Sequence, residues 1–187
     1  MIMDEERSYI HGTARELYGR VVYSHKTHEK EREIWGTKAA RMNMVNVFLT
    51  GLTTLFASIA ASLTPTWALI ATAISAVATV VFVVWQGSFD PAGKENQQRT
   101  AAKELLWIRE QLLLLIMDCH MPSVPLQQLQ KCLETINREL TAVYKFAPNT
   151  SPEAYSLADK SLKSGHFTFT DDEIDGFLPS VLRKNQP

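Results

Sequence analysis

The 187 residues carry 19 Lys and Arg side chains against 20 Asp and Glu side chains, which gives a net charge of −1 and a mean hydropathy of −0.10. Charge is also balanced within each flank of the chain, with eight basic and seven acidic residues before residue 42 and eleven and thirteen after residue 89. Neither flank has the basic excess of a nucleic-acid-binding surface, so no direct nucleic-acid binding is expected.

Residues 1–41 are predicted to form a cytoplasmic amphipathic helix followed by a juxtamembrane stem. Apolar side chains recur at intervals of four, three and four residues and would share one helical face; they are Ile10, Ala14, Leu17 and Val21. The highly charged stretch after residue 24 contains no strong stop signal, so we expect it to continue as helix into the next segment. His25 and His28 could share a helix face, but without a third ligand a solvated surface is favoured over a zinc site.

Residues 42–89 form a run of 48 consecutive residues without Asp, Glu, Lys or Arg. A helix needs roughly 20 apolar residues to cross the hydrocarbon core of a bilayer, so the run has room for two crossings. Its one breaker cluster is residues 62–66, where Pro65 removes a backbone donor and disfavours helix at the preceding residue. The sequence therefore predicts a transmembrane hairpin with helices over about residues 43–63 and 66–86. A cleaved signal peptide is not expected, because 41 residues, 15 of them charged, precede the first span.

Flanking residues predict how the hairpin lies in the bilayer. Trp67 and Trp85 are 18 residues apart, about 27 Å along a helix, which matches the spacing of the two aromatic belts of a membrane. Basic residues flank only the ends of the spans opposite the turn, and they are Lys38, Arg41, Lys94, Arg99 and Lys103. The positive-inside rule then places both termini in the cytoplasm. Arg41, Trp67 and Trp85 are the expected interface anchors.

The first span divides into two faces when it is wound at 100° per residue. The small and polar face contains Asn43, Asn46, Thr50, Thr54, Ala57 and Ala61, and the opposite face contains Val45, Phe48, Leu49, Leu52, Leu55, Phe56, Ile59 and Leu63. Polar groups are unfavourable against hydrocarbon, so we expect the first face to meet protein or water. It would either pack against another helix or line an aqueous path.

The second span has a small face that is expected to pack against the first span or a neighbouring subunit; this face contains Ala68, Ala71, Thr72, Ser75 and Thr79. Two helices cannot enclose a channel. A water-lining role therefore requires a homo-oligomer in the lipid bilayer.

Residues 90–147 are predicted to form a cytoplasmic antiparallel helical hairpin after a break at residues 87–93. Apolar residues recur every three or four positions in both helices, which is a heptad seam, and the connecting loop is too short to separate them. The first helix has further apolar residues, Leu106, Leu113, Leu114, Ile116 and Met117. They require a third packing partner, either the N-terminal helix or another subunit.

Residues 148–187 are interpreted as a linker, with a short turn or helix, and a docked C-terminal tail. Thr170 and Glu173 have the spacing of a capping box, so a short helix is expected there. Its apolar face is too small to fold alone. We expect the tail to dock on the helical hairpin or on a partner through Phe167, Phe169, Ile174, Phe177 and Leu178.

No motif for catalysis is present. The chain has no glycine-rich phosphate loop, nucleophile elbow or cysteine–histidine metal frame, and its five histidines are scattered singly. Cys119 and Cys132 lack paired metal-ligand spacing and lie on the side where thiols stay reduced. No enzymatic activity, metal or cofactor is expected.

The organisation of the whole chain resembles the SLATT domain family of bacterial two-transmembrane effectors, from about Tyr23 to Arg183. The shared features are a charged stem with Trp35, two uncharged spans, a cytoplasmic helical hairpin, and a tail running from Ser164-Gly165 through Phe169-Thr170 to Phe177-Leu178-Pro179. The resemblance implies an all-α protein of the bacterial inner membrane that forms pores or perturbs the membrane in antiphage defence. It implies neighbour-encoded partners, which would be a nucleotide-second-messenger synthase, a nucleotide sensor or a reverse transcriptase.

Three functional hypotheses remain. The first is a toxic oligomeric effector in which the small and polar faces of several first spans meet around an axis. The second is a non-conducting membrane anchor or scaffold for a soluble sensor or nucleotidyltransferase, and the third is a soluble protein that inserts only when triggered. The resemblance favours the first hypothesis, and loss of leakage on substituting Asn46 and Thr50 would separate it from the second.

Overall fold

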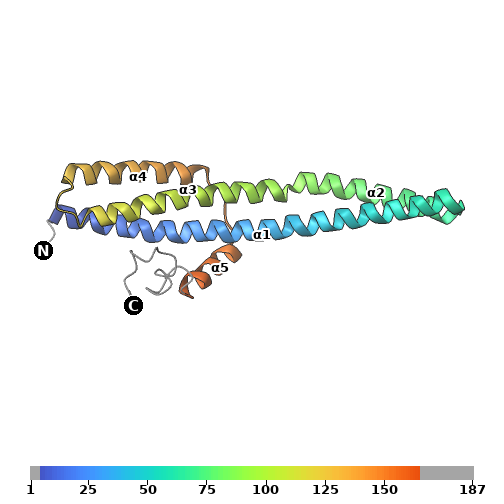
Figure 1. Cartoon of the computed structure of the whole chain (residues 1–187), viewed down its shortest axis with the longest axis horizontal. Helices are drawn as coiled ribbons and strands as arrows, with labels where there is room; N and C mark the ends of the chain where they lie inside the picture. Colours follow the sequence, from blue (N-terminus) through green and yellow to red (C-terminus); the bar gives the residue numbers. More distant parts are fainter. Residues whose placement is uncertain (1–4, 165–187) are drawn as a thin grey trace, which may run out of the picture.

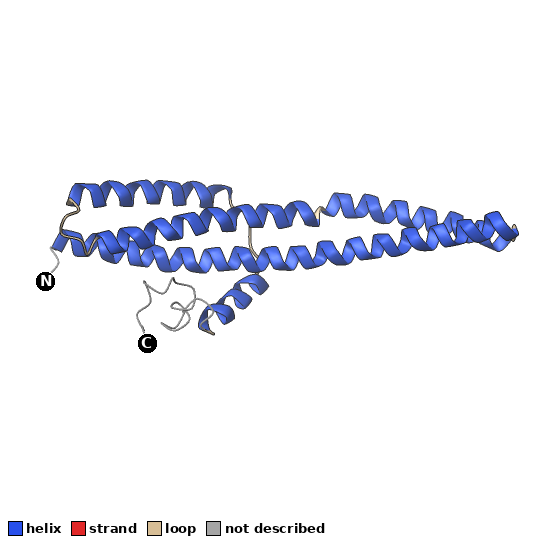
Figure 2. Cartoon of the chain, viewed as in Figure 1, coloured by secondary structure: helices blue, strands red, loops and turns tan. Residues whose placement is uncertain are grey.

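The computed structural model describes residues 5–164, which form five α-helices and contain no strand (Figures 1 and 2). The helices are α1 (Glu5–Leu63), α2 (Thr66–Phe89), α3 (Pro91–Asp118), α4 (Leu126–Phe146) and α5 (Pro152–Lys163). Figure 1 shows a long rod in which α2 and α3 follow one another alongside α1. The short helices α4 and α5 flank the rod on opposite sides in this view. The predicted all-α class is confirmed.

Helix α1 runs through 59 residues without interruption, a length of about 88 Å at 1.5 Å per residue. The charged stem therefore continues as helix into the first span, as the sequence indicated, and Gly36 does not end it. A Cβ atom at Gly36 would lie 3.3 Å from the Cδ atom of Glu95 on α3. This glycine thus leaves room for the carboxyl group of Glu95 against α1.

Two residues with positive φ mark the ends of α2. Thr64 (φ 50°) and Pro65 make the turn that reverses the chain between α1 and α2. At the other end a single residue, Asp90 (φ 43°), separates α2 from α3, and its side chain accepts a hydrogen bond from the Gly93 amide at 3.0 Å. Aspartate tolerates this left-handed conformation better than most residues. The break predicted over residues 87–93 is thus much shorter than expected.

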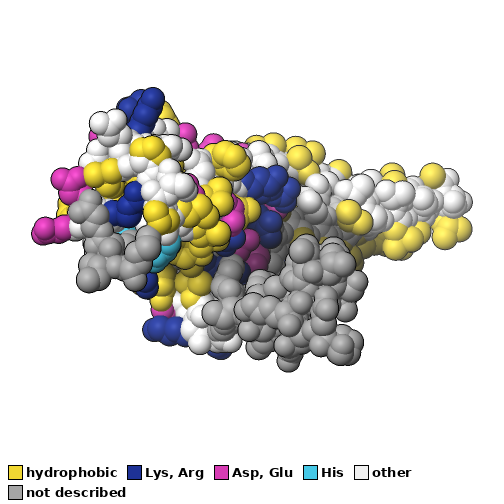
Figure 3. Space-filling model, turned by 60° about the vertical axis from the view of Figure 1, so that its left-hand side comes forward, with side chains coloured by type: hydrophobic (Ala, Val, Ile, Leu, Met, Phe, Trp, Pro, Cys, Tyr) yellow, Lys and Arg dark blue, Asp and Glu magenta, His cyan; other side chains and the backbone are white. Residues whose placement is uncertain are grey.

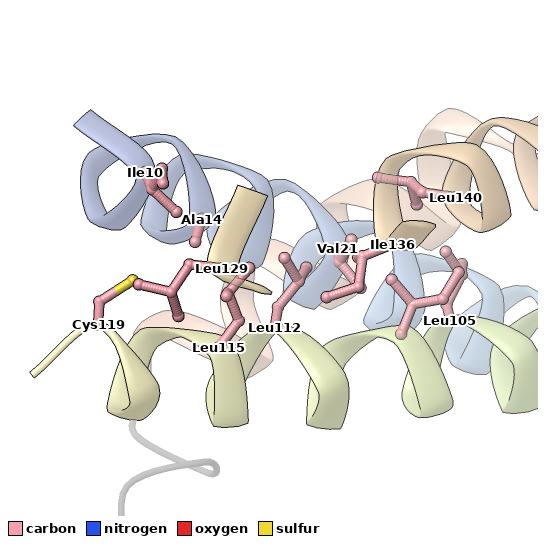
Figure 4. Close-up of a cluster of buried hydrophobic side chains, with 11 residues drawn as sticks. Ile10, Ala14, Val21, Leu105, Leu112, Leu115, Cys119, Leu129, Ile136 and Leu140 are labelled. Carbon is pink, nitrogen blue, oxygen red and sulfur yellow. The ribbon is translucent and has the colours of Figure 1, made fainter. Parts of the chain in front are cut away.

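The hydrophobic core is a cluster of apolar side chains from α1, α3 and α4 (Figure 4). Its members are Ile10, Ala14, Val21, Leu105, Ile108, Leu112, Leu115, Cys119, Leu129, Ile136 and Leu140. Each fully buried Leu or Ile stabilises the fold by roughly 1.5–3 kcal/mol. The predicted seam of α3 and α4 is therefore buried, and the N-terminal half of α1 packs against it. Of the further apolar residues of α3 for which a third partner was expected, only Ile116 packs against this core, and Leu106, Leu113, Leu114 and Met117 are exposed. Burial raises the pKa of the Cys119 thiol.

Helix α5 occupies the stretch that the sequence analysis interpreted as a linker with a short turn or helix. Ser151 caps the helix by accepting a hydrogen bond from the Ala154 amide at 3.2 Å. Ala154 and Ala158 are fully buried, and the rings of Tyr155 and Tyr23 stack with centroids 6.4 Å apart, so α5 packs against α1. The tail residues predicted to dock, Phe167, Phe169, Ile174, Phe177 and Leu178, lie outside the described residues.

Replacing Leu112 by Ala should destabilise the bundle of α1, α3 and α4 by about 2–5 kcal/mol, because the fully buried side chain would leave a cavity. The matched control is Leu114→Ala on the same helix. Leu114 is 59% exposed, and its truncation should change stability by about 0.5 kcal/mol. Urea unfolding of the protein in detergent, followed by circular dichroism, measures both values. Equal losses for the two variants would contradict the position of the core.

Candidate functional site

The hairpin of α1 and α2 presents an apolar surface. In Figure 3 the hairpin end shows hydrophobic side chains and no charged ones on the visible face, whereas charged side chains gather over the rest of the molecule. Both helices are long and apolar enough to cross a membrane. In the most apolar 18 residues of each, only 6% and 11% are buried. The core helix of a soluble protein would be mostly buried. The surface therefore suits contact with lipid rather than with a protein interior.

The two helices of the hairpin pack through a seam of mostly small or polar side chains. On α2 the predicted small face lies inside, with Ala68 and Ser75 buried and Ala71, Thr72 and Thr79 half-buried. On α1 the half-buried or buried positions include Asn46, Leu49, Thr53, Phe56 and Ala60. The hydroxyl groups of Thr53 and Thr79 lie 3.4 Å apart across the seam. The expected packing of the second span against the first is confirmed.

The small and polar face of α1 does not coincide with this seam. Asn46 is half-buried, but Thr50, Thr54, Ala57 and Ala61 are exposed on the outside of the hairpin. Leu49 and Phe56, which the helical projection placed on the opposite face, take part in the packing instead. The residues of α1 that meet α2 recur at intervals of three and four positions, and they come from both the small and polar face and the apolar face. Whether the exposed residues line a pore or contact a second chain stays a prediction.

The exposed hydroxyl groups on α1 are hydrogen-bonded within their own helix. Thr50 donates to the carbonyl oxygen of Asn46 and Thr54 donates to that of Thr50, both at 2.9 Å. Asn43 also has a partner, because the Gln86 side-chain amide donates to its Oδ1 atom at 2.7 Å. This last bond joins α1 to α2 at the end of the hairpin remote from the turn.

Aromatic rings and basic side chains gather next to that bond, on the side remote from the turn of the hairpin. The Trp35 and Phe89 rings lie 5.5 Å apart, and Phe89 stacks on Trp85 at 5.7 Å. The Lys94 ammonium lies 4.6 Å from the Trp35 centroid and 4.3 Å from the Phe89 centroid, and Lys38 lies 4.4 Å from Trp35. Cation–π contacts of this kind hold α1, α2 and α3 together where an apolar surface meets a charged one. Arg41, the other predicted anchor at this end, is exposed.

A buried carboxylate ties α5 to α1 one turn further from the hairpin. Glu31 is only 4% exposed, and its two oxygens accept hydrogen bonds from the Trp35 indole (2.8 Å), the Ser151 amide (2.8 Å) and the Ser151 hydroxyl (2.5 Å). Burying a charged group is unfavourable unless it is hydrogen-bonded, and these three donors meet that need. Glu31 on α1 therefore binds Ser151, the N-cap residue of α5.

A second buried contact connects α1, α3 and the segment before α5. The His28 Nδ1 atom lies 2.5 Å from the Gln98 Oε1 atom, and Gln98 donates through Nε2 to the Asn149 carbonyl at 2.9 Å. His25 and His28 are 5% and 6% exposed, so the expectation of a solvated histidine face is wrong. The missed signal is their register, since the apolar face of residues 14, 17 and 21 continues to positions 25 and 28 at intervals of four and three.

His25 is a buried neutral imidazole. Burial lowers its pKa below 6.5, and the positive charges of Arg109 on α3 and of Lys26 on α1 act in the same direction. The carboxylate of Glu29, 3.8 Å from Nε2, opposes that shift, while Nδ1 has no hydrogen-bond partner in the described part of the chain.

Within residues 5–164 no three His, Cys, Asp or Glu side chains are grouped to hold a metal ion.

One family model matches this chain, over residues 10–173, and it is described as SMODS and SLOG-associating 2TM effector domain family 4 (SLATT_4). The matched residues include the whole hairpin and the helices α3 to α5. No curated protein sequence and no solved structure matches the chain.

Replacing Glu31 by Gln should loosen α5, because a neutral amide cannot satisfy three donors as a carboxylate does. Hydrogen bonds to charged groups contribute about 1.5–3 kcal/mol, so amide hydrogen exchange in α5 should accelerate at least roughly tenfold. Glu33→Gln is the control, because this exposed residue of the same helix forms its ion pair within residues 5–164 with Lys30 and not with α5. Equal exchange rates in the two variants would show that the carboxylate does not hold α5.

The pH dependence of stability should report on His25. The unfolded chain binds a proton at the ordinary pKa of 6.5 and the folded chain only at lower pH, so stability falls as the pH decreases below 6.5. In His25→Phe this loss should become smaller, while stability at pH 7.5 changes little because the buried imidazole is neutral there. Thermal unfolding between pH 7.5 and 5.5 tests both statements. Parallel curves for the two proteins would contradict them.

Proposed function

Because the chain belongs to the SMODS and SLOG-associating 2TM effector domain family, we propose that it is a pore-forming effector of bacterial antiphage defence. In this proposal several copies assemble in the inner membrane and, once triggered, let ions through. Cell growth then stops because the membrane potential is lost.

The observation that carries the proposal is the outward position of the small and polar face of α1. Four of its six residues, Thr50, Thr54, Ala57 and Ala61, are exposed and directed away from α2. In an oligomer this face is available to meet its counterparts around a common axis, where hydroxyl groups and small side chains leave room for water. Within a single hairpin it has no protein partner.

A second observation supports assembly outside the membrane. Helix α3 exposes apolar side chains at intervals of seven residues, with Leu106 and Leu113 in one row and Trp107 and Leu114 in the next, and Met117 extends the first row. Exposed apolar rows at heptad spacing are typical of a helix that packs against another helix. A second copy of this chain is the occupant that we propose, since assembly in the membrane would bring the α3 helices of neighbouring copies together.

The orientation follows from the charges at the two ends of the hairpin. Lys38, Arg41, Lys94 and Arg99 lie at the end remote from the turn, while residues 62–66 at the turn carry no charge. Basic residues beside a span remain in the cytoplasm. We therefore place both termini and α3 to α5 inside the cell. The bound partner or ligand that triggers the effector would act on these helices.

The family description names association with SMODS and SLOG proteins. For this chain we propose as partner a neighbour-encoded nucleotide-second-messenger synthase, nucleotide sensor or reverse transcriptase. Helix α1 provides a route for such a signal, because it continues without a break from the cytoplasmic bundle into the membrane. A ligand or partner that binds one tilt of this helix more tightly would shift the population toward that tilt.

A second candidate function is a non-conducting anchor or scaffold, and one specific observation favours it. The hydroxyl groups of Thr50 and Thr54 already donate to carbonyl oxygens of their own helix. A hydroxyl bonded in this way loses less on contact with hydrocarbon, so the face does not strictly require water or a partner chain.

Leakage from vesicles separates the two functions. We expect purified protein, reconstituted at increasing protein-to-lipid ratios in the absence and presence of cyclic nucleotides, to release a trapped dye. Thr50→Leu with Thr54→Leu, which changes two exposed hydroxyl residues of the small and polar face, should reduce the release roughly tenfold, because an apolar lining dewets a narrow pore. The matched control is Val45→Leu with Phe48→Leu, which changes two exposed apolar residues of the same helix. Unchanged leakage in the first double variant would contradict the pore, and absence of leakage in every protein would favour the anchor.

A further inference from the structure

We propose that a groove between α1 and α5, at the cytoplasmic surface of the membrane, binds the phosphodiester headgroup of a phospholipid. The inference depends on insertion of the hairpin into a bilayer. It does not depend on whether the protein conducts.

The groove has a volume of about 340 Å³, within the range of small-molecule sites. Its lining consists of Lys30, Glu33, Ile34, Thr37, Lys38 and Arg41 from α1 and Glu153 and Leu157 from α5. The α5 wall is held in place by the hydrogen bonds between Glu31 and Ser151, one residue before the helix begins. The site is therefore formed by the same contacts that dock α5.

Two cations in the groove lack an acidic partner. Lys30 is paired with Glu33 at 2.8 Å, but neither Lys38 nor Arg41 lies within ion-pair distance of a carboxylate in the described part of the chain. Lys38 is held over the Trp35 ring instead. A guanidinium and an ammonium three residues apart on one helix are suited to share a phosphate, the first through two parallel hydrogen bonds and the second as a point charge.

The depth of these cations matches the headgroup layer. Arg41 is the last charged residue before the uncharged run, and Lys38 is about 4.5 Å further along the helix axis. Headgroups occupy roughly 5–8 Å on each side of the hydrocarbon core, so both side chains lie within their reach. Lys30, about 16 Å from Arg41, lies beyond that layer and closes the cytoplasmic end of the groove.

The acidic residues of the lining limit the charge of the ligand. Three cations and two carboxylates leave the groove with a net charge of +1, which balances a single phosphodiester. A polyphosphate or a phosphomonoester would bring more negative charge close to Glu33 and Glu153, and repulsion between like charges would oppose its binding. The groove therefore fits an anionic phospholipid such as phosphatidylglycerol, whose acyl chains continue along the apolar surface of the hairpin.

Native mass spectrometry of the full chain in detergent tests the proposal. With phosphatidylglycerol added, the wild type should retain bound lipid, and Lys38→Gln with Arg41→Gln should weaken binding by roughly twenty-five-fold, which is about fivefold for each basic residue lost at a membrane surface. Thr37→Trp, which fills the groove without changing its charge, should also abolish the retained lipid. Lys131→Gln with Arg138→Gln is the control, because it removes the same charge from exposed positions on α4.

The control variant with Lys131→Gln and Arg138→Gln should bind lipid as the wild type does.

The deacylated headgroup, glycerophosphoglycerol, distinguishes a lipid site from a site for soluble phosphodiesters, and it should fail to displace the lipid at equal concentration. Equal lipid binding by the wild type and the Lys38–Arg41 double variant would overturn the proposal. Displacement by the deacylated headgroup would overturn the assignment to a lipid. If the protein leaks dye but binds no lipid, the lipid site is wrong and the pore proposal stands. If it binds lipid but does not leak dye, the pore proposal is wrong and the lipid site stands.

Discussion

The structure depends on one constraint, the continuity of α1 from the charged part of the chain into the uncharged part. No proline occurs between Glu5 and Leu63, and within the described residues α1 contacts each of the other four helices. Its N-terminal half supplies a face to the hydrophobic core and its C-terminal half supplies one helix of the apolar hairpin. No proline kink or other break separates the two halves, so the helix has no hinge of that kind between the core and the hairpin.

Three kinds of packing follow one another along this helix, and each suits its surroundings. In the bundle of α1, α3 and α4, burial of Leu112, Ile136 and their neighbours removes apolar surface from water and so stabilises the fold. Lipid around the hairpin supplies no hydrophobic effect between its two helices. Their packing therefore depends on close approach at small residues such as Ala68 and Ser75. Between them lies the buried polar layer of Glu31, His28 and Gln98, where hydrogen bonds rather than area determine which segments meet.

The features that sequence could predict are those encoded locally. The absence of charge over residues 42–89 and the breaker at Pro65 are enough to place both spans and their turn, and heptad spacing is enough to find the seam of α3 and α4. The charged stem was expected to be helical because nothing in it stops a helix. These properties depend on neighbours within a few residues along the chain.

What sequence could not predict depends on partners far away in the chain. Glu31 is buried because Ser151, 120 residues later, supplies two of its hydrogen bonds, and a glutamate in a charged stretch gives no sign of such a partner. The histidine register was available but was outweighed by the surrounding charges. For the first span, helical projection groups the small and polar residues on one face, but it could not tell which part of the circumference meets α2, because that depends on how α2 crosses α1.

The central claim is that α1 and α2 cross a bilayer as a hairpin whose uncharged turn emerges on the far side. The most direct measurement is the reaction of single cysteines with a membrane-impermeant maleimide in intact cells, with Cys119 and Cys132 replaced by Ala. The account predicts that Ser62→Cys at the turn is labelled in intact cells and that Lys131→Cys on α4 is labelled only after the membrane is permeabilised. Labelling of the α4 position in intact cells, or of the turn position only after permeabilisation, would contradict it.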